Sequence, residues 1–427
     1  MSINTSQKRL KVLVVAPEFP LINQPWMDTY LEQLIINKVD ISVFSLNNSP
    51  SRYNTKVDTL NLLDYTFAYS FRKSNMLQQI IKKPRIYSTI STFLKLRRQR
   101  LLGSVPNIKL LFYIAYFYAV PEVYKGISVI HSHSEALSHR FIILAEMLNT
   151  PLVMTFHGLP PKGVPQLSSE KRKELYSYAK TVVVNTNFAK QQVVDFGCPA
   201  EKVKILPQGL PIEDFPFNPA PFPANGQPLR ILSVGRFHRD KGQHYSLLAL
   251  KRLLNDGVPV HWTFVGSGPD LEKLKTLANK LHVDKQVTFR VGVSSMELLN
   301  LYHESQIFVL ASINTPGAHI ETQGVVLQEA QASGSIVVAT RTGGIPECLN
   351  HDEDAVLVAQ QSSRGIHEAI SAIYHNPDSW SELRKNAREN VEKKFGANVI
   401  GAEMADMLMS HSCNSIGDLE SQYVREY

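Results

Sequence analysis

Residues 230–242 read RILSVGRFHRDKG, an apolar run that ends at a glycine and is followed by several cations. The run begins a second series of alternating strand-like and helix-like segments, after a first series that begins at Lys11–Ala16. Strands that alternate with helices form a parallel sheet with helices on both faces. The sequence therefore predicts an α/β protein with two Rossmann-like, doubly wound domains that face each other across a cleft. The predicted strands are Lys11–Ala16, Ile41–Leu46, Val129–His131, Leu152–Phe156, Thr181–Asn185 and Val203–Leu206, then Arg230–Val234, Val260–Val265, Gln286–Val291, Gln306–Leu310, Ile336–Ala339 and Val356–Val358.

A proline-rich segment separates the two series. Phe215–Pro228 contains five prolines and cannot form a regular element. A chain of 427 residues is also too long for one ordinary core. We therefore predict an N-terminal domain at 1–207, a linker at 208–228, a C-terminal domain at 229–395, and a final helix with a tail at 396–427 that returns to the N-terminal domain.

Composition indicates a globular protein of a reducing compartment. Hydrophobic residues make up 44% and charged residues 19% of the chain. The three cysteines are far apart and show neither metal-ligand nor disulfide spacing. The longest apolar run, Leu110–Val120, is about half of the ~20 residues that cross a membrane. With no apolar signal region near the first residues, we expect a soluble, cytoplasmic protein.

The stretch ETQGVVLQE at 321–329 carries a candidate binding site. A helix is predicted from Gly324 to about Ser333, and the amides of Gly324, Val325 and Val326 at its start suit a phosphate. A phosphate repels carboxylates, so Glu321 and Glu329 are better assigned to adjacent hydroxyls of a sugar or ribose. Alternatively, the two acids only complement the dipole of the helix.

Two cations follow the first strand of the second series. Gly235 lets the chain turn, and Arg236 and Lys241 then lie on one loop at the carboxyl end of that strand. Ligands of doubly wound sheets bind at this end, and two cations suit a diphosphate leaving group. Ordinary ion pairing with Asp240 is the alternative. VGSG at 265–268 and TGGIPE at 342–347 are further glycine turns after predicted strands.

The ordered set VGRFHRDKG, FVGSGPD, VTFRVG, ETQGVVLQEAQASG and TGGIPE resembles the donor domain of the family-4 retaining glycosyltransferases. The resemblance is dense from Ile231 to Glu347. In the first half, IHSH at 130–133, TFHG at 155–158 and VNTN at 184–187 resemble weaker landmarks of the family. Departures are PEFPLINQP at 17–25 in place of a glycine-rich loop, no acid shortly after His157-Gly158, and Gln208-Gly209 in place of Asn-Gly.

The resemblance implies a GT-B architecture and the transfer of a hexose from a nucleotide-diphosphate sugar to a hydroxyl of a glycan or lipid-linked acceptor, in bacterial surface polysaccharide synthesis. It implies retention of configuration by front-face attack, with the nucleotide sugar as co-substrate and no further cofactor. By matching position, Arg236 and Lys241 would bind the diphosphate, Glu329 the ribose and Glu321 the sugar hydroxyls. Backbone groups near Arg290–Gly292 would contact the base. His157 would face the sugar, and His131 and His133 are candidate cleft residues.

No metal site is predicted. Asp352-Glu-Asp354 lies in a polar loop, where a solvated turn is expected, and it does not follow a strand. Three other protein classes were weighed. A dehydrogenase would need G-x-G-x-x-G with an acid downstream, which is absent after Ala16 and Val234. A UDP-sugar epimerase of the same fold and a non-catalytic nucleotide-sugar-binding protein remain alternatives.

The stretch from Tyr65 to Pro121 contains no acid, although the chain has a net charge of only +7. Uncompensated cations repel one another and indicate an anionic partner. Because no nucleic-acid module surrounds them, we expect an anionic membrane surface, met by the basic tract 71–109, and a peripheral location on the inner face of the membrane. A solvated helical face is the alternative. The cations are Arg72, Lys73, Lys82, Lys83, Arg85, Lys95, Arg97, Arg98, Arg100 and Lys109.

Overall fold

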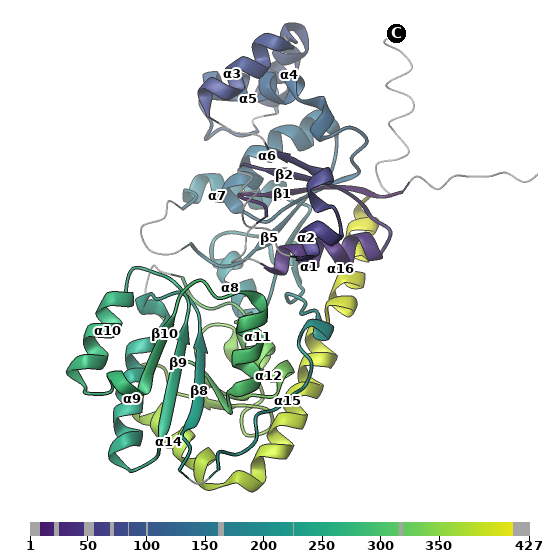
Figure 1. The fold of residues 1–427 in the computed structure, drawn as a ribbon. Coiled ribbons are helices and arrows are strands. Elements are labelled where there is room, and N and C mark those ends of the chain that lie inside the picture. The colour runs from purple at the N-terminus through teal and green to yellow at the C-terminus, as the bar shows by residue number, and fades with distance from the viewer. Residues whose placement is uncertain are drawn as a thin grey trace, which may run out of the picture.

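The computed structural model describes residues 9–20, 25–46, 55–68, 72–83, 85–99, 101–160, 166–224, 226–315 and 319–412. These residues form two α/β domains, one above the other in Figure 1, each built on a parallel sheet. The predicted fold class is therefore confirmed. Arg100 of the basic tract and Cys413 lie outside the described residues.

The N-terminal domain contains a seven-stranded parallel sheet in the order β3-β2-β1-β4-β5-β6-β7. Its central strands are almost fully buried, because helices cover both faces. Six strands were predicted within a residue or two of their observed ends, whereas the short edge strand β3 was missed. The strands are β1 Lys11–Ala16, β2 Asp40–Ser45, β3 Thr66–Ala68, β4 Val129–Ser132, β5 Leu152–Phe156, β6 Thr181–Val184 and β7 Val203–Ile205.

The C-terminal domain contains a six-stranded parallel sheet in the order β10-β9-β8-β11-β12-β13. The order changes direction on either side of β8, which is the topology of a doubly wound sheet. Loops that follow β8 and β11 therefore lie next to each other at the carboxyl edge. The strands are β8 Leu229–Val234, β9 Val260–Val265, β10 Val287–Arg290, β11 Ile307–Leu310, β12 Ile336–Thr340 and β13 Val356–Val358.

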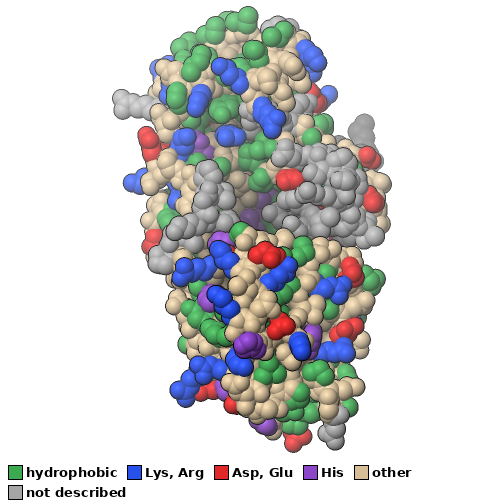
Figure 2. All heavy atoms as spheres, turned by 60° about the vertical axis from the view of Figure 1, so that its left-hand side comes forward, with side chains coloured by type: hydrophobic (Ala, Val, Ile, Leu, Met, Phe, Trp, Pro, Cys, Tyr) green, Lys and Arg blue, Asp and Glu red, His purple; other side chains and the backbone are tan. Residues whose placement is uncertain are grey.

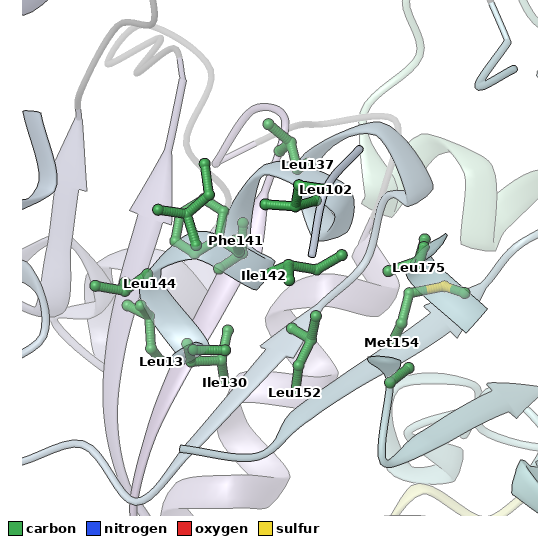
Figure 3. Packing of buried hydrophobic residues seen from close by; sticks show 14 of the residues in the cluster. Leu13, Leu102, Ile130, Leu137, Phe141, Ile142, Leu144, Leu152, Met154 and Leu175 are labelled. Atoms are coloured by element: carbon green, nitrogen blue, oxygen red, sulfur yellow. The ribbon is translucent and has the colours of Figure 1, made fainter. Parts of the chain in front are cut away.

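Helices cover the faces of both sheets and bury apolar side chains against them. Figure 3 shows one such layer, in which Phe141 and Ile142 of α6 pack over Leu13, Ile130 and Leu152 of three neighbouring strands. The helices are α1 Pro25–Ile36, α2 Thr55–Thr59, α3 Lys73–Lys82, α4 Ile86–Arg98, α5 Asn107–Ala119, α6 Glu135–Leu148, α7 Ser169–Tyr178, α8 Asn187–Asp195, α9 Gln243–Asn255, α10 Leu271–Lys280, α11 Ser295–Glu304, α12 Val325–Ser333, α13 Ile345–Cys348, α14 Ser363–His375, α15 Trp380–Phe395 and α16 Ala397–Ser412.

Helices α3, α4 and α5 form an extension at the end of the N-terminal domain farthest from the C-terminal domain (Figure 1). Leu96 and Leu102 point into the core, and Leu102 lies beside Leu137 of α6 in Figure 3. Leu94, by contrast, is exposed. None of the helices in the described part of the chain has the length and apolarity needed to cross a membrane.

The C-terminal segment connects the two domains. Leu210 of the linker pairs with the chain between α15 and α16, since its amide donates to Phe395 and its carbonyl accepts from Ala397. Helix α16 then packs against α1 of the N-terminal domain, where Gly401 lies close to Gln33. The residue limits of the two domains remain predictions.

Candidate functional site

Loops at the carboxyl edge of the C-terminal sheet contact one another and form one platform. The amide of Gly235, after β8, donates to Val265 at the end of β9, and the amide of Gly266 donates to Arg290 at the end of β10. The loop after β8 also contacts the loop after β11, where the amide of Ile313 donates to Asp240. The sequence-predicted residues of this domain therefore share one edge of the sheet.

Lys241 and Glu321 form an ion pair on this platform, although 80 positions separate them in the chain. Each side chain is only 13% exposed, so water screens the two charges weakly. Burial opposes ionisation of Glu321, but the charge of Lys241 and further cations outweigh it and hold the pKa of the carboxyl below its usual value. The site thus contains a charged carboxylate beside an ammonium group.

Two glycines of TGGIPE position Glu321. The amide of Gly344 donates to the carbonyl of Glu321 at 2.9 Å. At Gly343, which has a φ of +56°, an added Cβ would lie 2.0 Å from the same carbonyl oxygen. Only glycine allows this approach. The sequence predicted a turn near the cleft here, but not its role in holding the chain beneath Glu321.

Arg236 forms an ion pair with Asp240 at 3.4 Å, and the sequence analysis offered this pairing as an alternative for the loop. Asp240 is buried and also contacts His238 at 2.7 Å. The Arg236 side chain is still 43% exposed, so its guanidinium has N–H groups left for a ligand. Asp240 therefore orients Arg236, whereas Lys241 turns away toward Glu321.

Helix α12 begins as predicted, with Gly324 in a left-handed conformation at φ +82° and with Val325 as the first helical residue. The first amides of a helix, here those of Val325 and Val326, have no partner within the helix and can bind an anion. Glu329 lies in the second turn, where Tyr302 donates a hydrogen bond of 2.7 Å to its Oε2. Burial raises the pKa of Glu329, although this bond opposes the shift. One carboxylate oxygen is thus held by the protein.

Arg290 ends β10 and extends toward α11, where its guanidinium contacts Glu297 at 3.2 Å. Both side chains are exposed, and the backbone carbonyl of Arg290 accepts from Gly266. The side chain of Arg290 is therefore occupied on the surface by Glu297, and the expectation that the backbone of this stretch meets the base stays a prediction.

Three histidines of the N-terminal domain lie together at the carboxyl ends of β4 and β5. His133 Nδ1 lies 3.1 Å from His157 Nε2, and His131 Nδ1 lies 2.5 Å from the hydroxyl of Tyr30. Burial lowers the pKa of His157 to about 4 and, with the nearby charge of His157, that of His131 to about 3. The cluster is therefore neutral near pH 7, and His157 can take part in hydrogen bonds but supplies no positive charge.

A small cavity of about 50 Å³ borders this cluster. The ring of Trp26 lies tilted against that of His157, with 4.4 Å between the ring centroids, and the side chain of Gln208 lies 3.3 Å from His157 Nδ1. Met404 of α16 lines the opposite wall. The residues Pro17–Pro25, which depart from the family pattern, lead into Trp26, but 21–24 lie outside the described residues. Sequence reasoning named the histidines separately and did not predict that they form one cluster.

The two domains contact each other beside the platform, where Figure 2 shows a hollow between them. From the loop that carries Glu321, His319 contacts the carbonyl of Leu159 at 3.0 Å, and the carbonyl of Thr322 accepts from Thr186 at 2.9 Å. Glu347 binds the first amides of α8, each at 2.7 Å. The His157 side and the Lys241 side of the molecule therefore face the same space.

The described residues contain no group of three or more His, Cys, Asp or Glu side chains arranged to hold a metal ion. For Asp354, the predicted solvated turn is wrong. This carboxylate is buried and accepts hydrogen bonds from Asn350 of the same loop and from Gln331 of α12. Asp354 therefore fixes the loop before β13.

Two doubly wound domains with strand-end loops that face each other define the GT-B class of proteins. Two family models match the chain: "Glycosyltransferase Family 4" over residues 29–214 and "Glycosyl transferases group 1" over residues 214–394. Together they extend without a gap from residue 29 to residue 394. The chain belongs to this family of glycosyltransferases, as its resemblance predicted.

Curated relatives act in exopolysaccharide synthesis according to their names. WcaL of Escherichia coli K12, assigned as a colanic acid biosynthesis glycosyltransferase, is 31% identical over 258 residues, which are 60% of this chain and 63% of WcaL. The amylovoran biosynthesis glycosyltransferase AmsK of Erwinia amylovora is 28% identical over 62% of this chain and 65% of AmsK. The match thus spans less than two thirds of the length of these relatives.

Solved structures share the whole fold. HepE of Anabaena, in complex with UDP, aligns with a TM-score of 0.69 over 94% of this chain and 100% of HepE, at 15% identity. A glycosyltransferase of Rickettsia africae aligns with a TM-score of 0.70 over 95% of this chain and 100% of its own, at 19% identity. At such identities the likeness concerns the fold, and it confirms the predicted two-domain architecture.

Proposed function

We propose that the protein is a retaining glycosyltransferase. It moves a hexose from a nucleotide-diphosphate sugar to a hydroxyl group of a glycan or lipid-linked acceptor. The names of WcaL and AmsK support an acceptor from bacterial surface polysaccharide synthesis. The UDP complex of HepE supports a nucleotide donor.

The ion pair between Lys241 and Glu321 carries this proposal. An ammonium group and a carboxylate side by side suit a ligand that presents a phosphate next to sugar hydroxyls, because the phosphate takes the cation and the hydroxyls take the carboxylate. A nucleotide-diphosphate sugar offers both groups at adjoining positions. A simple phosphate ligand would leave Glu321 as an uncompensated repulsive charge.

The remaining groups on the platform fit the rest of the donor. Arg236 adds a second cation for the diphosphate, and the amides of Val325 and Val326 add hydrogen-bond donors. Glu329 lies one helical turn after the first amides of α12, and the carboxylate oxygen that Tyr302 does not bind suits a ribose hydroxyl. Backbone groups near Arg290 then meet the base.

In this proposal the anomeric configuration is retained because the acceptor hydroxyl attacks the anomeric carbon on the same face from which the diphosphate leaves. As the bond between the sugar and the phosphate lengthens, a phosphate oxygen accepts the proton of the acceptor hydroxyl, and that hydroxyl bonds to the anomeric carbon. Lys241 and Arg236 neutralise the charge that develops on the diphosphate, so no metal ion is required. Neutral His157 exchanges its contact with the side chain of Gln208 for a hydrogen bond to a sugar hydroxyl and so helps to position the ring.

An acceptor attached to lipid would place the enzyme on the inner face of a membrane. The basic tract 71–109 supports this location, because cations near an anionic leaflet are each worth roughly 1 kcal/mol. The cations belong to the N-terminal domain, which receives the acceptor in this proposal, so docking would hold that domain at the membrane that contains the acceptor.

Product analysis with labelled UDP-, GDP- and ADP-sugars tests the proposal. Transfer should move the label to a glycan or lipid-linked acceptor with the anomeric configuration of the donor, as read by NMR. Label that stays in a nucleotide sugar of altered configuration would show an epimerase. Ligand-induced thermal stabilisation without any product would show a binding protein. Lys241→Ala serves as the matched inactive control.

A further inference from the structure

The helical extension exposes an unusual amount of apolar surface. Seven of the fourteen exposed large hydrophobic side chains among the described residues lie on α3, α4 and α5, which make up less than a tenth of the chain. Two of them are 87% and 76% exposed, Tyr87 and Ile108. Exposed apolar patches of this kind mark interaction surfaces. The seven residues are Leu77, Ile81, Ile86, Tyr87, Ile90, Leu94 and Ile108.

The apolar residues of α4 form a stripe on the side of the helix that faces away from the core. Ile86, Ile90 and Leu94 repeat every four residues and therefore share one face of the helix. Leu96 on the other side is fully buried, and Thr92 contacts the hydroxyl of Tyr118 on α5 at 2.7 Å. Because the inner face already packs against α5, the outer stripe is not needed for folding.

Cations surround this stripe. The expectation of uncompensated cations is wrong for Lys83 and Lys95, which pair with Glu122 and Glu146. Lys73, Lys82, Arg85, Arg98 and Lys109 are exposed and have no ion-pair partner among the described residues. In Figure 2, blue side chains lie beside the green ones at the upper end of the molecule, over this extension. Arg97 does not belong to the surface, because it donates to the carbonyl of Val105 at 2.6 Å and lies over the ring of Phe93.

We propose that the outer face of α3 and α4, with the first turn of α5, inserts its aliphatic side chains into an anionic bilayer while the cations around it bind lipid headgroups. Aliphatic side chains ringed by Lys and Arg are the pattern of a helix that lies in a membrane interface. Nucleic acid would use the cations but not the aliphatic stripe. A second copy of the chain would bring like charges together.

The extension is attached firmly enough to orient the enzyme on the membrane. Met76 of α3, Leu96 of α4 and Leu102 are buried in the same core cluster as the central strands, so the three helices cannot swing independently without exposing them. Docking therefore fixes the N-terminal domain, while the C-terminal domain lies away from the bilayer (Figure 1). This inference rests on the proposed function only for the nature of the acceptor.

Co-sedimentation with vesicles tests the inference. The full chain should bind vesicles of phosphatidylcholine mixed with phosphatidylglycerol much more than pure phosphatidylcholine. High salt should weaken binding but not abolish it, because aliphatic insertion is not screened. The double variant I86N/I90N should bind at least about tenfold more weakly, as the loss of two inserted aliphatic side chains implies. I36N/V399N, which changes two exposed aliphatic side chains on α1 and α16, should bind like wild type.

Unchanged binding of I86N/I90N, or no binding to either vesicle type, would overturn the inference. Self-association without vesicles that is lost in I86N/I90N, measured by sedimentation velocity, would instead assign the face to a second copy. Thermal stabilisation by nucleoside diphosphates should be equal in wild type and I86N/I90N, which shows that the variant is folded. If the wild-type protein binds anionic vesicles but transfers no sugar, the proposed function is contradicted and this inference is still supported.

Discussion

Replacing Glu321 with Gln probes the part of the site on which the proposed function depends. In the structure Glu321 binds Lys241, so a diphosphate that needs Lys241 must compete with this carboxylate. Gln keeps the size and the hydrogen-bonding ability of the side chain but removes its charge. The variant should therefore bind a free nucleoside diphosphate more tightly, while it loses turnover with the sugar nucleotide.

The expected changes in nucleoside diphosphate affinity and in turnover can be estimated from the ion pair between Lys241 and Glu321. A hydrogen bond between charged groups contributes about 1.5–3 kcal/mol, and Lys241 has three N–H donors, so the ligand displaces only part of the contact. If about 1 kcal/mol of competition is removed, the affinity for the nucleoside diphosphate rises about fivefold. Loss of a charged group that acts on the sugar in the transition state costs about 10²-fold in kcat.

Titration calorimetry with the nucleoside diphosphate and steady-state kinetics with the sugar nucleotide measure the two effects separately. Lys241→Ala should lose both affinity and turnover. Glu304→Gln is a matched control, since Glu304 is an exposed glutamate of the same domain that pairs with Arg230 at 3.2 Å, and neither quantity should change. Tenfold weaker diphosphate binding by Glu321→Gln would refute the division of roles between Lys241 and Glu321.

Four further predictions follow from the same geometry. Arg236→Ala should lower kcat/KM about 10²-fold in steady-state kinetics, and near-normal turnover would show that Arg236 does not bind the diphosphate. Glu329→Ala should weaken calorimetric binding of the nucleoside diphosphate, because its partner is the ribose; unchanged affinity would contradict that role. EDTA should leave turnover intact, and inactivation that Mg²⁺ reverses would show a metal requirement. Burial lowers the pKa of His157 from 6.5 to about 4, so the unfolded chain binds more protons between these values, and the free energy of unfolding should fall by up to about 3 kcal/mol as pH drops through this window. Urea unfolding at several pH values should show a smaller loss for His157→Gln.

The buried strands could be predicted from the sequence because both faces of a parallel sheet are covered. Lys11–Ala16 is a continuous apolar run after its first residue, and Val260–Val265 (VHWTFV) has four apolar residues, three of them at alternate positions; the structure places both strands at the predicted residues. The edge strand β3, Thr66–Ala68, has three partly buried or exposed residues and no apolar run. Its pairing with β2 depends on tertiary position, which periodicity does not encode.

The basic tract shows where a sequence pattern becomes ambiguous. Leu94 and Leu96 are two positions apart on α4, yet one is exposed and the other is buried. Leu96 thus belongs to the core, whereas the expectation that the exposed face of the tract meets lipid stays a prediction. Which leucine faces inward depends on the position of α5, and Arg97 turns toward Val105 for the same reason.

In the candidate site, the motifs identified the residues but not their partners. Lys241 had a carboxylate at the neighbouring position, Asp240, and another 80 positions away, Glu321. The structure pairs it with the distant one, because the loops after β8 and β11 meet at the sheet edge. His131, His133 and His157 are likewise brought together by adjacent strands, an arrangement that three separate local motifs cannot specify.

The loop that carries Glu321 connects the platform of the C-terminal domain to the rest of the molecule. Three of its residues contact the N-terminal domain or the linker: His319 contacts Leu159, the carbonyl of Thr322 accepts from Thr186, and Gln323 exchanges hydrogen bonds with the backbone of Gln208. On the other side, Gly344 holds the carbonyl of Glu321. A shift of the N-terminal domain therefore strains the same few residues that set the distance between Glu321 and Lys241. Because Gln208 also contacts His157, the histidine cluster is connected to the ion pair through hydrogen bonds between Gln208 and Gln323 and through the chain from Gln323 to Glu321. The position of the N-terminal domain and the geometry of the Glu321 carboxylate are thus determined together.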